Sequence, residues 1–368
     1  MATPSPARSF LGTMSLVFLA IAAIFAADTF LAKTEQAESR VQAARLFEQG
    51  RAFMHRGKNA EAIDPIKDAI AIERGNRDFM RTLAQAQLTA GETADAESTL
   101  TDLLQSDATD GLASLVMGRT LVREGRFAEA ISYFHRAVYG RWNQDAAGSQ
   151  LRARFELIDV LAQQNSKEEL LAELLPVVEQ APQDLKTRTR LGQLFLMADS
   201  PARAAVVFRG ILHDDLANAD AHAGLGEAEF AQSNYRAAQR DFQAALRLAP
   251  DDQASRKKLG LCDELLILDP TLRGLSQEEH LRRSLKLVEL TMGEASQCAG
   301  PSPPPELQGL FDMAAKALNA HVIASRRSDV SESNLDLAEQ LWQARKKECK
   351  PPPAADSPLA LVLARIAQ

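Results

Sequence analysis

The chain of 368 residues is longer than one small core requires and fits two or three domains or a repeat array. Hydrophobic residues make up 46% and aromatic residues only 5%, so small apolar side chains dominate, which favours closely packed helices over sandwiches or barrels. The net charge of -7 argues against nucleic acid as a bulk partner, because nucleic-acid binding needs a basic surface.

The first element is an apolar run at residues 9–31. No charge lies between Ser9 and Ala27. About 22 helical residues span roughly 33 Å, enough for a hydrocarbon core of about 30 Å. We therefore predict a transmembrane helix or signal anchor at 9–31, preceded by a cytoplasmic tail at 1–8 and followed by a linker at 32–42.

Two alternatives for this run stay open. A cleaved signal peptide would use Ala20 and Ala22 as the small residues of its cleavage site, but it would leave Phe25 and Leu31 on the mature end. A buried globular helix is the other alternative, although nothing else in the chain is so apolar.

The side of the membrane is predicted from the flanking charges. Arg8 precedes the run, and Lys33 and Arg40 follow it among acidic residues, so the cytoplasmic bias of Lys and Arg is weak here. A short N-terminal tail is easily kept inside, so we predict that residues 33–368 form a periplasmic domain. Secretion after signal cleavage and an N-out anchor with a cytoplasmic domain are the alternatives.

A period of 34 residues organises the middle of the chain. Three columns of small residues recur at that period: Gly50, Ala84 and Gly118; Gly57, Gly91 and Gly125; and Ala62, Ala96 and Ala130. After an insert at 145–150 the period resumes at Ile158, Gly192, Gly226 and Gly260. The predicted repeats are 43–76, 77–110 and 111–144, forming a first block over 43–144, and 151–184, 185–218 and 219–252, forming a second over 151–252.

Each repeat is predicted to form two helices joined by a tight turn. In the third repeat the apolar positions of Phe127 to Val138 recur at helical spacing. Gly118 and Ala130 are small where the two helices cross, and Gly125 supplies a positive φ at the end of the first helix.

These segments resemble the tetratricopeptide repeat family. The resemblance is carried by the period, the small columns, Gly118…Gly125-Arg126-Phe127…Ala130, and Asn234-Tyr235…Ala238…Phe242…Pro250, and it covers residues 43–260. It implies an all-α fold, a right-handed α-solenoid of antiparallel helix pairs that serves as a binding scaffold. The fourth repeat departs from the pattern at Ile158, Leu170 and Pro176, and the first at Pro65, which predicts local kinks.

The period is lost beyond Cys262, but helical signals continue. We predict a divergent capping hairpin at 253–295, then Pro-rich linkers and C-terminal helices at 296–368. Residues 359–366 are predicted to pack back on the domain, with a partner-binding helix as the alternative. Cys298 and Cys349 are a hypothetical disulfide, with two unrelated thiols as the alternative, and Cys262 is expected to be a small core residue.

No spacing of metal ligands, catalytic residues or phosphate-binding glycines occurs, so we predict no cofactor, no metal and no enzyme activity. The nearest cluster of possible ligands is His213, Asp214, Asp215, Asp220 and His222, which we interpret as a solvated turn.

A binding surface is predicted from the first helices of the repeats, which line the concave face in proteins of this kind. Its predicted residues are Phe47, Arg51, Arg81, Gln85, Arg119, Arg123, Arg152, Phe155, Arg190 and Gln193. Arginine forks suit carboxylates, so the expected ligands are proteins or peptides with acidic or C-terminal carboxylate segments. The alternative is that these arginines pair with neighbouring Asp and Glu.

The leading functional hypothesis is a membrane-anchored scaffold or adaptor that binds partner proteins on the concave face. An accessory or regulatory subunit of one membrane or envelope complex is the second hypothesis. An enzyme with its site in the C-terminal region is the third.

Overall fold

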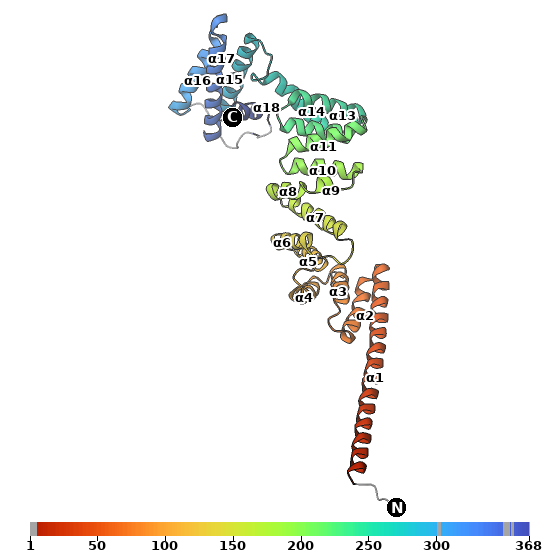
Figure 1. The fold of residues 1–368 in the computed structure, drawn as a ribbon. Coiled ribbons are helices and arrows are strands. Elements are labelled where there is room, and N and C mark those ends of the chain that lie inside the picture. The colour runs from red at the N-terminus through yellow and green to blue at the C-terminus, as the bar shows by residue number, and fades with distance from the viewer. Residues whose placement is uncertain (1–5, 300–302, 349–353, 355–356, 368) are drawn as a thin grey trace, which may run out of the picture. The chain divides into compact units, whose positions relative to one another are not determined.

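The computed structural model describes residues 6–299, 303–348, 354 and 357–367, without the side chains of residues 6–24, 26, 32, 298 and 324. Within those ranges the chain is helical and has no strand. It divides into two compact units, residues 1–181 and 182–368 (Figure 1). The predicted all-α solenoid of helix pairs is confirmed.

Unit 1 consists of antiparallel helix pairs, in which α1 packs against α2, α3 against α4, α5 against α6, and α7 against α8. Its helices are α1 (Pro6–His55), α2 (Asn59–Ile72), α3 (Arg77–Ala90), α4 (Thr93–Ser106), α5 (Gly111–Arg123), α6 (Phe127–Tyr139), α7 (Ala146–Gln163), α8 (Lys167–Leu174) and α9 (Val177–Gln180).

The long helix α1 joins the predicted membrane segment to the first repeat. Among the side chains of α1 that the structure describes, those of its C-terminal part pack on the other helices, for example at Ala43, Phe47 and Gly50. The predicted linker at 32–42 is instead a continuous part of α1, because no Gly or Pro occurs between Thr13 and Gln49 to stop the helix.

The predicted membrane span at 9–31 falls largely on residues 9–24, whose side chains lie outside the described part of the structure. Among the residues that are described, no helix is long and apolar enough to cross a membrane.

The small columns of the repeats lie where the helices of a pair cross. A Cβ atom added to Gly118 would lie 3.1 Å from the ring of Phe134, and one added to Gly226 would lie 2.8 Å from the ring of Phe242. Glycine at these positions therefore leaves room for the phenylalanine of the partner helix.

The fourth repeat differs from the others, as its sequence indicated. Ile158 and Leu170 are fully buried in place of small residues. Its second helix is interrupted at Leu175 and Pro176, which separate α8 from α9. Pro65, in contrast, lies inside α2, which runs through it.

Unit 2 begins with two helix pairs, α10 with α11 and α12 with α13, followed by helices of a different arrangement. Its elements are α10 (Leu185–Met197), α11 (Pro201–Asp214), α12 (Ala219–Ala231), α13 (Tyr235–Leu248), α14 (Gln253–Leu268), α15 (Gln277–Ala299), α16 (Pro305–Asn319), the 3₁₀ helix η1 (Ala324–Arg326), α17 (Arg327–Glu348) and α18 (Pro358–Ile366).

The hairpin predicted at 253–295 is not formed. Helix α14 packs on α13 and α18, whereas α15 packs chiefly on α17. The connection from α14 to α15 contains Pro270 and Gly274, the latter with a φ of 85°, so the chain changes direction instead of folding back.

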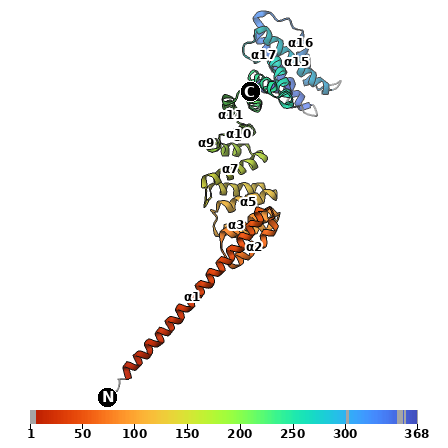
Figure 2. The ribbon, with the colours of Figure 1, turned by 90° about the vertical axis from the view of Figure 1, so that its right-hand side faces the viewer.

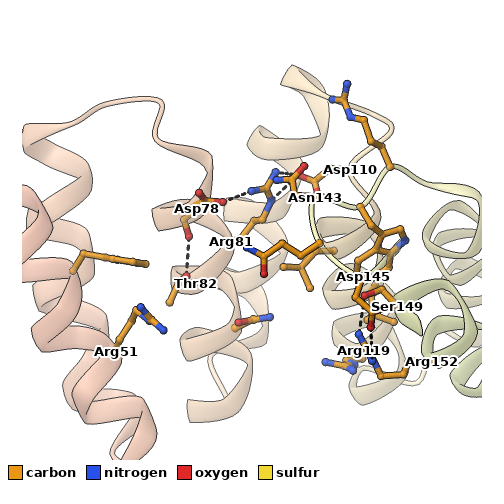
Figure 3. A pocket seen from close by; sticks show the side chains of 17 residues that line it. Arg51, Asp78, Arg81, Thr82, Asp110, Arg119, Asn143, Asp145, Ser149 and Arg152 are labelled. Atoms are coloured by element: carbon orange, nitrogen blue, oxygen red, sulfur yellow. Dashed lines mark hydrogen bonds and ion pairs between the residues drawn. The ribbon is translucent and has the colours of Figure 1, made fainter. Parts of the chain in front are cut away.

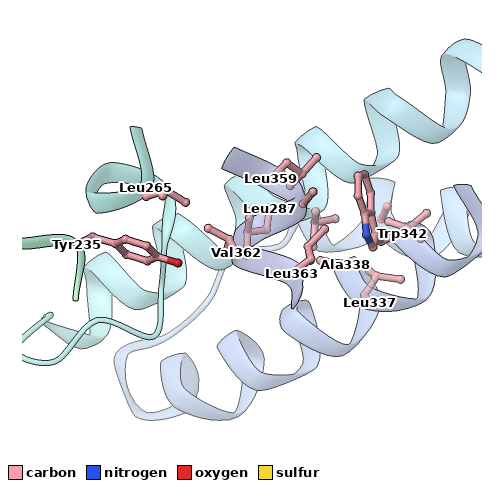
Figure 4. Packing of buried hydrophobic residues seen from close by; sticks show 13 residues of the cluster. Tyr235, Leu265, Leu287, Leu337, Ala338, Trp342, Leu359, Val362 and Leu363 are labelled. Atoms are coloured by element: carbon pink, nitrogen blue, oxygen red, sulfur yellow. The ribbon is translucent and has the colours of Figure 1, made fainter. Parts of the chain in front are cut away.

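The core of the C-terminal helices is one apolar cluster (Figure 4). Leu359, Val362 and Leu363 of α18 are buried in it with Trp342 of α17, so the predicted packing of the last apolar segment is confirmed.

The three cysteines lie in unit 2. Cys262 is fully buried, and its pKa is raised to about 11, chiefly by burial, which agrees with a small core residue. The predicted Cys298–Cys349 pair lies outside the residues whose side chains are described.

Candidate functional site

A groove of about 740 Å³ lies in unit 1 along the first helices of its repeats (Figure 3). The lining residues come from α1, α3, α5 and α7 and from the α6–α7 connection at 141–145. Phe47, Leu112 and Leu115 supply apolar surface, and most of the remaining lining is polar or charged.

The α6–α7 connection is fixed against the start of α5. The Gly111 amide donates to the Arg141 carbonyl at 3.0 Å, and the Arg141 amide donates to the Thr109 carbonyl at 2.7 Å. Trp142 donates its indole N–H to the Ala137 carbonyl at 2.9 Å, and its ring leaves no room for a side chain at Gly111. These contacts make the connection a wall of the groove.

Asp110 organises the floor of the groove. Its side chain is 3% exposed and accepts from the Ala113 amide at 3.0 Å, which caps α5. It also accepts from Nε and Nη2 of Arg81 at 2.7 and 2.6 Å, and Arg81 pairs in addition with Asp78. Burial alone would lower the pKa of Arg81, but the hydrogen bonds and charge of Asp110 and Asp78 outweigh it and raise the pKa.

A second anchor, Asp107, lies beside this floor. It pairs with Arg77 at 2.9 Å and with Arg141, and the Thr109 hydroxyl donates to it at 2.7 Å. The hydrogen bonds from Thr109, and then the interaction with Arg141, hold the pKa of Asp107 well below its usual range. Asp107 therefore stays ionised and ties α3 to the α6–α7 connection.

Arg119 and Arg123 of α5 already have partners within the protein. Arg119 makes a bidentate pair with Glu156 at 2.7 and 2.5 Å, and hydrogen bonding to that carboxylate raises the pKa of Arg119. Arg123 donates to the Leu88 carbonyl. A ligand would have to compete with these contacts.

Arg51 and Arg152 are the groove arginines whose acidic partners are themselves largely exposed. Arg51 pairs with Glu48 at 2.9 Å, and the two side chains are 46% and 63% exposed. Arg152 lies 3.4 Å from Asp145, with side chains 65% and 63% exposed, and donates to the Ser149 hydroxyl at 2.7 Å. Exposed pairs of this kind contribute only about 0–1 kcal/mol, so a ligand carboxylate can replace the acidic partner.

The structure brings together only part of the predicted binding surface. Phe47, Arg51, Arg81, Gln85, Arg119 and Arg152 line the groove. Arg123 lines a neighbouring hollow of about 330 Å³ with Arg119 and Glu156, Phe155 is half-buried on α7, and Arg190 and Gln193 belong to unit 2.

Sequence reasoning did not find the wall at 141–145 or the acidic residues that partner the arginines. The break in the repeat period at 145–150 was the available signal for the wall, because an insert between repeats must leave the regular helix packing. Asp78 precedes Arg81 by three residues on α3, whereas the pairing of Arg81 with Asp110 depends on the stacking of α3 on α5.

In the cluster near residue 213, His222 is held by contacts within unit 2. The His222 ring lies 3.1 Å from Asp241 through Nδ1 and 3.2 Å from the Leu216 carbonyl through Nε2. No group of His, Cys, Asp and Glu that could hold a metal occurs among the described residues.

Comparison with known proteins identifies the repeats. Models described as tetratricopeptide repeat match residues 53–119, and again residues 115–184 and 224–262. The chain carries tetratricopeptide repeats. No curated protein matches it.

Several solved tetratricopeptide repeat proteins are similar in part. YrrB, a TPR protein with an unusual peptide-binding site, is 20% identical, with a TM-score of 0.44 over 52% of this chain and 96% of its own. PilW, a type IV pilus biogenesis factor, is 17% identical, with a TM-score of 0.40 over 59% and 96%. The C-terminal part of a TPR protein from Cytophaga hutchinsonii is 11% identical, with a TM-score of 0.45 over 84% and 97%.

Proposed function

We propose that this protein is a membrane-anchored interaction scaffold that binds a segment of a partner protein in the groove of unit 1. Tetratricopeptide repeat proteins are generally protein-interaction scaffolds. The observation that carries the proposal is the groove itself, which has apolar surface, a fixed polar floor and a wall from outside the repeat pattern.

The proposed ligand is a polypeptide segment with acidic side chains or a terminal carboxylate. Arg81 and Arg119 are committed to internal carboxylates and serve mainly to fix the groove. Arg51 and Arg152 hold exposed, replaceable partners, so we assign carboxylate recognition to them. Apolar ligand side chains would contact Phe47, which lines the groove and is positioned by stacking on Phe79 at a centroid distance of 4.3 Å.

Charge reversal tests this assignment. Arg152→Glu should reduce recovery of the partner from cross-linked membranes by about tenfold or more, because a charge-assisted pair is replaced by repulsion. Arg136→Glu is the matched control, since Arg136 is exposed on α6 and does not line the groove. Equal recovery with both variants would contradict recognition through Arg152.

For the membrane, we propose that residues 9–31 form a single span and that the repeats lie on the extracytoplasmic side. The proposal rests on the uncharged run from Ser9 to Ala27. A reporter fused to the C-terminus and active only outside the cytoplasm should be active. Full activity of a cytoplasm-only reporter, or release of the chain by alkaline carbonate, would contradict this topology.

The role proposed is binding and not catalysis. The same groove would also suit a dedicated subunit that holds one partner, and quantitative mass spectrometry of the cross-linked material distinguishes that case by a fixed stoichiometry.

A further inference from the structure

The segment of α1 before the first repeat stands apart from the other helices of unit 1. Every described side chain from residue 25 to residue 42 is exposed, and the first buried one is Ala43. Both views of the fold show this part of α1 extending away from α2 (Figures 1 and 2). Most helix stability in proteins comes from packing one face against a partner, and no described side chain of this segment is buried against another helix.

One side of this segment has an apolar stripe. Ala27, Phe30, Thr34, Ala37 and Val41 follow one another at alternating intervals of three and four residues, which is the a and d spacing of a coiled coil. Phe30, at the end of the proposed membrane span, is 68% exposed, and Val41, beyond the span, is 53% exposed, so neither is covered by another helix of the described chain.

The stripe is separate from the face that packs on the repeats. Gly50 packs against Ile66 of α2. It lies nine residues after Val41, which at about 100° per residue places the two on opposite sides of the helix. The first repeat therefore cannot cover the stripe.

A surface depression lies beside the stripe, between side chains of α1. A hollow of about 340 Å³ is lined only by residues of α1, namely Ala37, Glu38, Val41, Gln42 and Arg45. Three of these residues occupy successive heptad positions: Ala37 is at d, Glu38 at e and Val41 at the next a. In a parallel coiled coil, these positions form most of the hole that receives a d residue of the opposite helix.

The charges beside the stripe select a second copy in parallel. In this register Lys33 occupies a g position and Glu38 the e position five residues later, so two parallel copies would form the pair twice. Farther along, Arg40 would face Arg45 of the second copy, and these like charges repel. The favourable contact between the two copies therefore ends near Val41, where α1 begins to pack on its own repeats.

We propose that residues 27–41 of α1 pair in parallel with the same segment of a second copy, so that the protein presents two grooves from one helical stalk. The inference rests on the proposed membrane anchor, because two heptads alone are short and two anchored copies are held parallel and close together.

Disulfide trapping in membranes tests the pairing. The full chain is prepared with Cys262→Ala, Cys298→Ser and Cys349→Ser, and with Ala37→Cys in the stripe or Ser39→Cys as the exposed control on another side of the helix. Mild oxidation should convert most of the Ala37→Cys chain into a dimer and leave Ser39→Cys largely monomeric. Equal trapping at the two positions, or trapping at neither, would overturn the proposal.

Charge exchange tests the register. Glu38→Lys should lower trapping at position 37 several-fold, Lys33→Glu with Glu38→Lys should restore it, and Arg45→Glu should increase it. If trapping does not respond to any of these changes, the parallel register is wrong. If the trapped species contains a different protein, the second copy is not the partner. Carbonate extraction of the same samples reports the anchor separately, so a membrane-bound chain without trapping sinks only the pairing.

Discussion

The turn after the first helix of each of the six repeats contains one residue in the left-handed conformation. Gly57, Gly91 and Gly125 occupy this position in the first block of repeats, with φ between 75° and 93°. In the second block the same position holds Asn165, Asp199 and Ser233, with φ of 54°, 53° and 60°. The conformation is thus a property of the turn, and a side chain there is strained by about 1–2 kcal/mol, less for Asn and Asp.

Ser233→Gly should therefore stabilise unit 2. The change removes the contact between Cβ and the backbone at positive φ, and we expect a gain of up to about 1 kcal/mol in the free energy of unfolding. Chemical denaturation followed by circular dichroism measures it. Asn165→Gly is the comparison and should gain less, because Asn tolerates this conformation better; a loss of stability in Ser233→Gly would show that the hydroxyl contributes more than the strain costs.

Replacement by alanine is expected to change the stability in opposite directions at two glycines that lie one repeat apart. Gly226→Ala would place a Cβ atom 2.8 Å from the Phe242 ring, whereas Gly260→Ala would meet nothing within 4 Å. Overpacking costs about 1–3 kcal/mol, and an unobstructed Ala in a helix gains about 0.5–1 kcal/mol over Gly. The transition midpoint in urea should fall for the first variant and rise for the second, and a fall in both would contradict the open space at Gly260.

At the scale of elements, the contacts of Asp110 join α3, α5 and the α6–α7 connection. The carboxylate caps α5, receives both bonds from Arg81 and lies beside the backbone bridge between Asp110 and Arg141. Loss of its charge would leave a nearly buried guanidinium with only the exposed Asp78 as partner. The Asp110–Arg81 pair is therefore the nearly buried ion pair that joins these elements at the groove floor.

Asp110→Asn should lower the free energy of unfolding of unit 1 by about 3 kcal/mol, since breaking a buried pair leaves a charge without compensation. Asp78→Asn is the matched control, because the Asp78 side chain is 75% exposed and an exposed pair contributes about 1 kcal/mol or less. Differential scanning calorimetry of the two variants distinguishes them. Equal losses would mean that Asp110 does not hold the groove floor.

The sequence was sufficient for the elements that repeat and insufficient for those that do not. The 34-residue period and the columns of small residues were enough to predict the helix pairs. The contacts within a pair, such as Gly118 against Phe134, join residues that are close in the chain. The pairing of α15 with α17 involves residues such as Ser284 and Asn334, whose side chains are hydrogen-bonded at 3.1 Å across 50 positions. No local pattern reports such a contact, which is why a hairpin over 253–295 was wrongly expected.

The candidate site was predictable in part for the same reason. Six of the ten predicted surface residues line the groove, as expected for first helices that share one face. Whether an arginine is free or paired depends on neighbours such as Glu156, which lies 37 positions from Arg119. The balance between recognition and internal pairing was therefore set by tertiary structure.

At the scale of the whole molecule, unit 1 contains the helix from the predicted membrane segment and the groove, and unit 2 has a helical core of its own. The groove carries the function proposed, and α1 determines where it is presented. The central claim is that a partner segment occupies the groove, and it can be tested without knowing the identity of the partner.

The most direct test is photo-cross-linking in living cells from Gln85, which lies on α3 within the groove. A photoreactive residue at Gln85 should give discrete products with a partner protein, and these should diminish when Arg152→Glu is added. The same residue at Asp102, exposed on α4 and away from the groove lining, should give none of those products. Identical products from both positions, or none from Gln85 in cells that contain the full chain, would contradict the claim that the groove binds a partner.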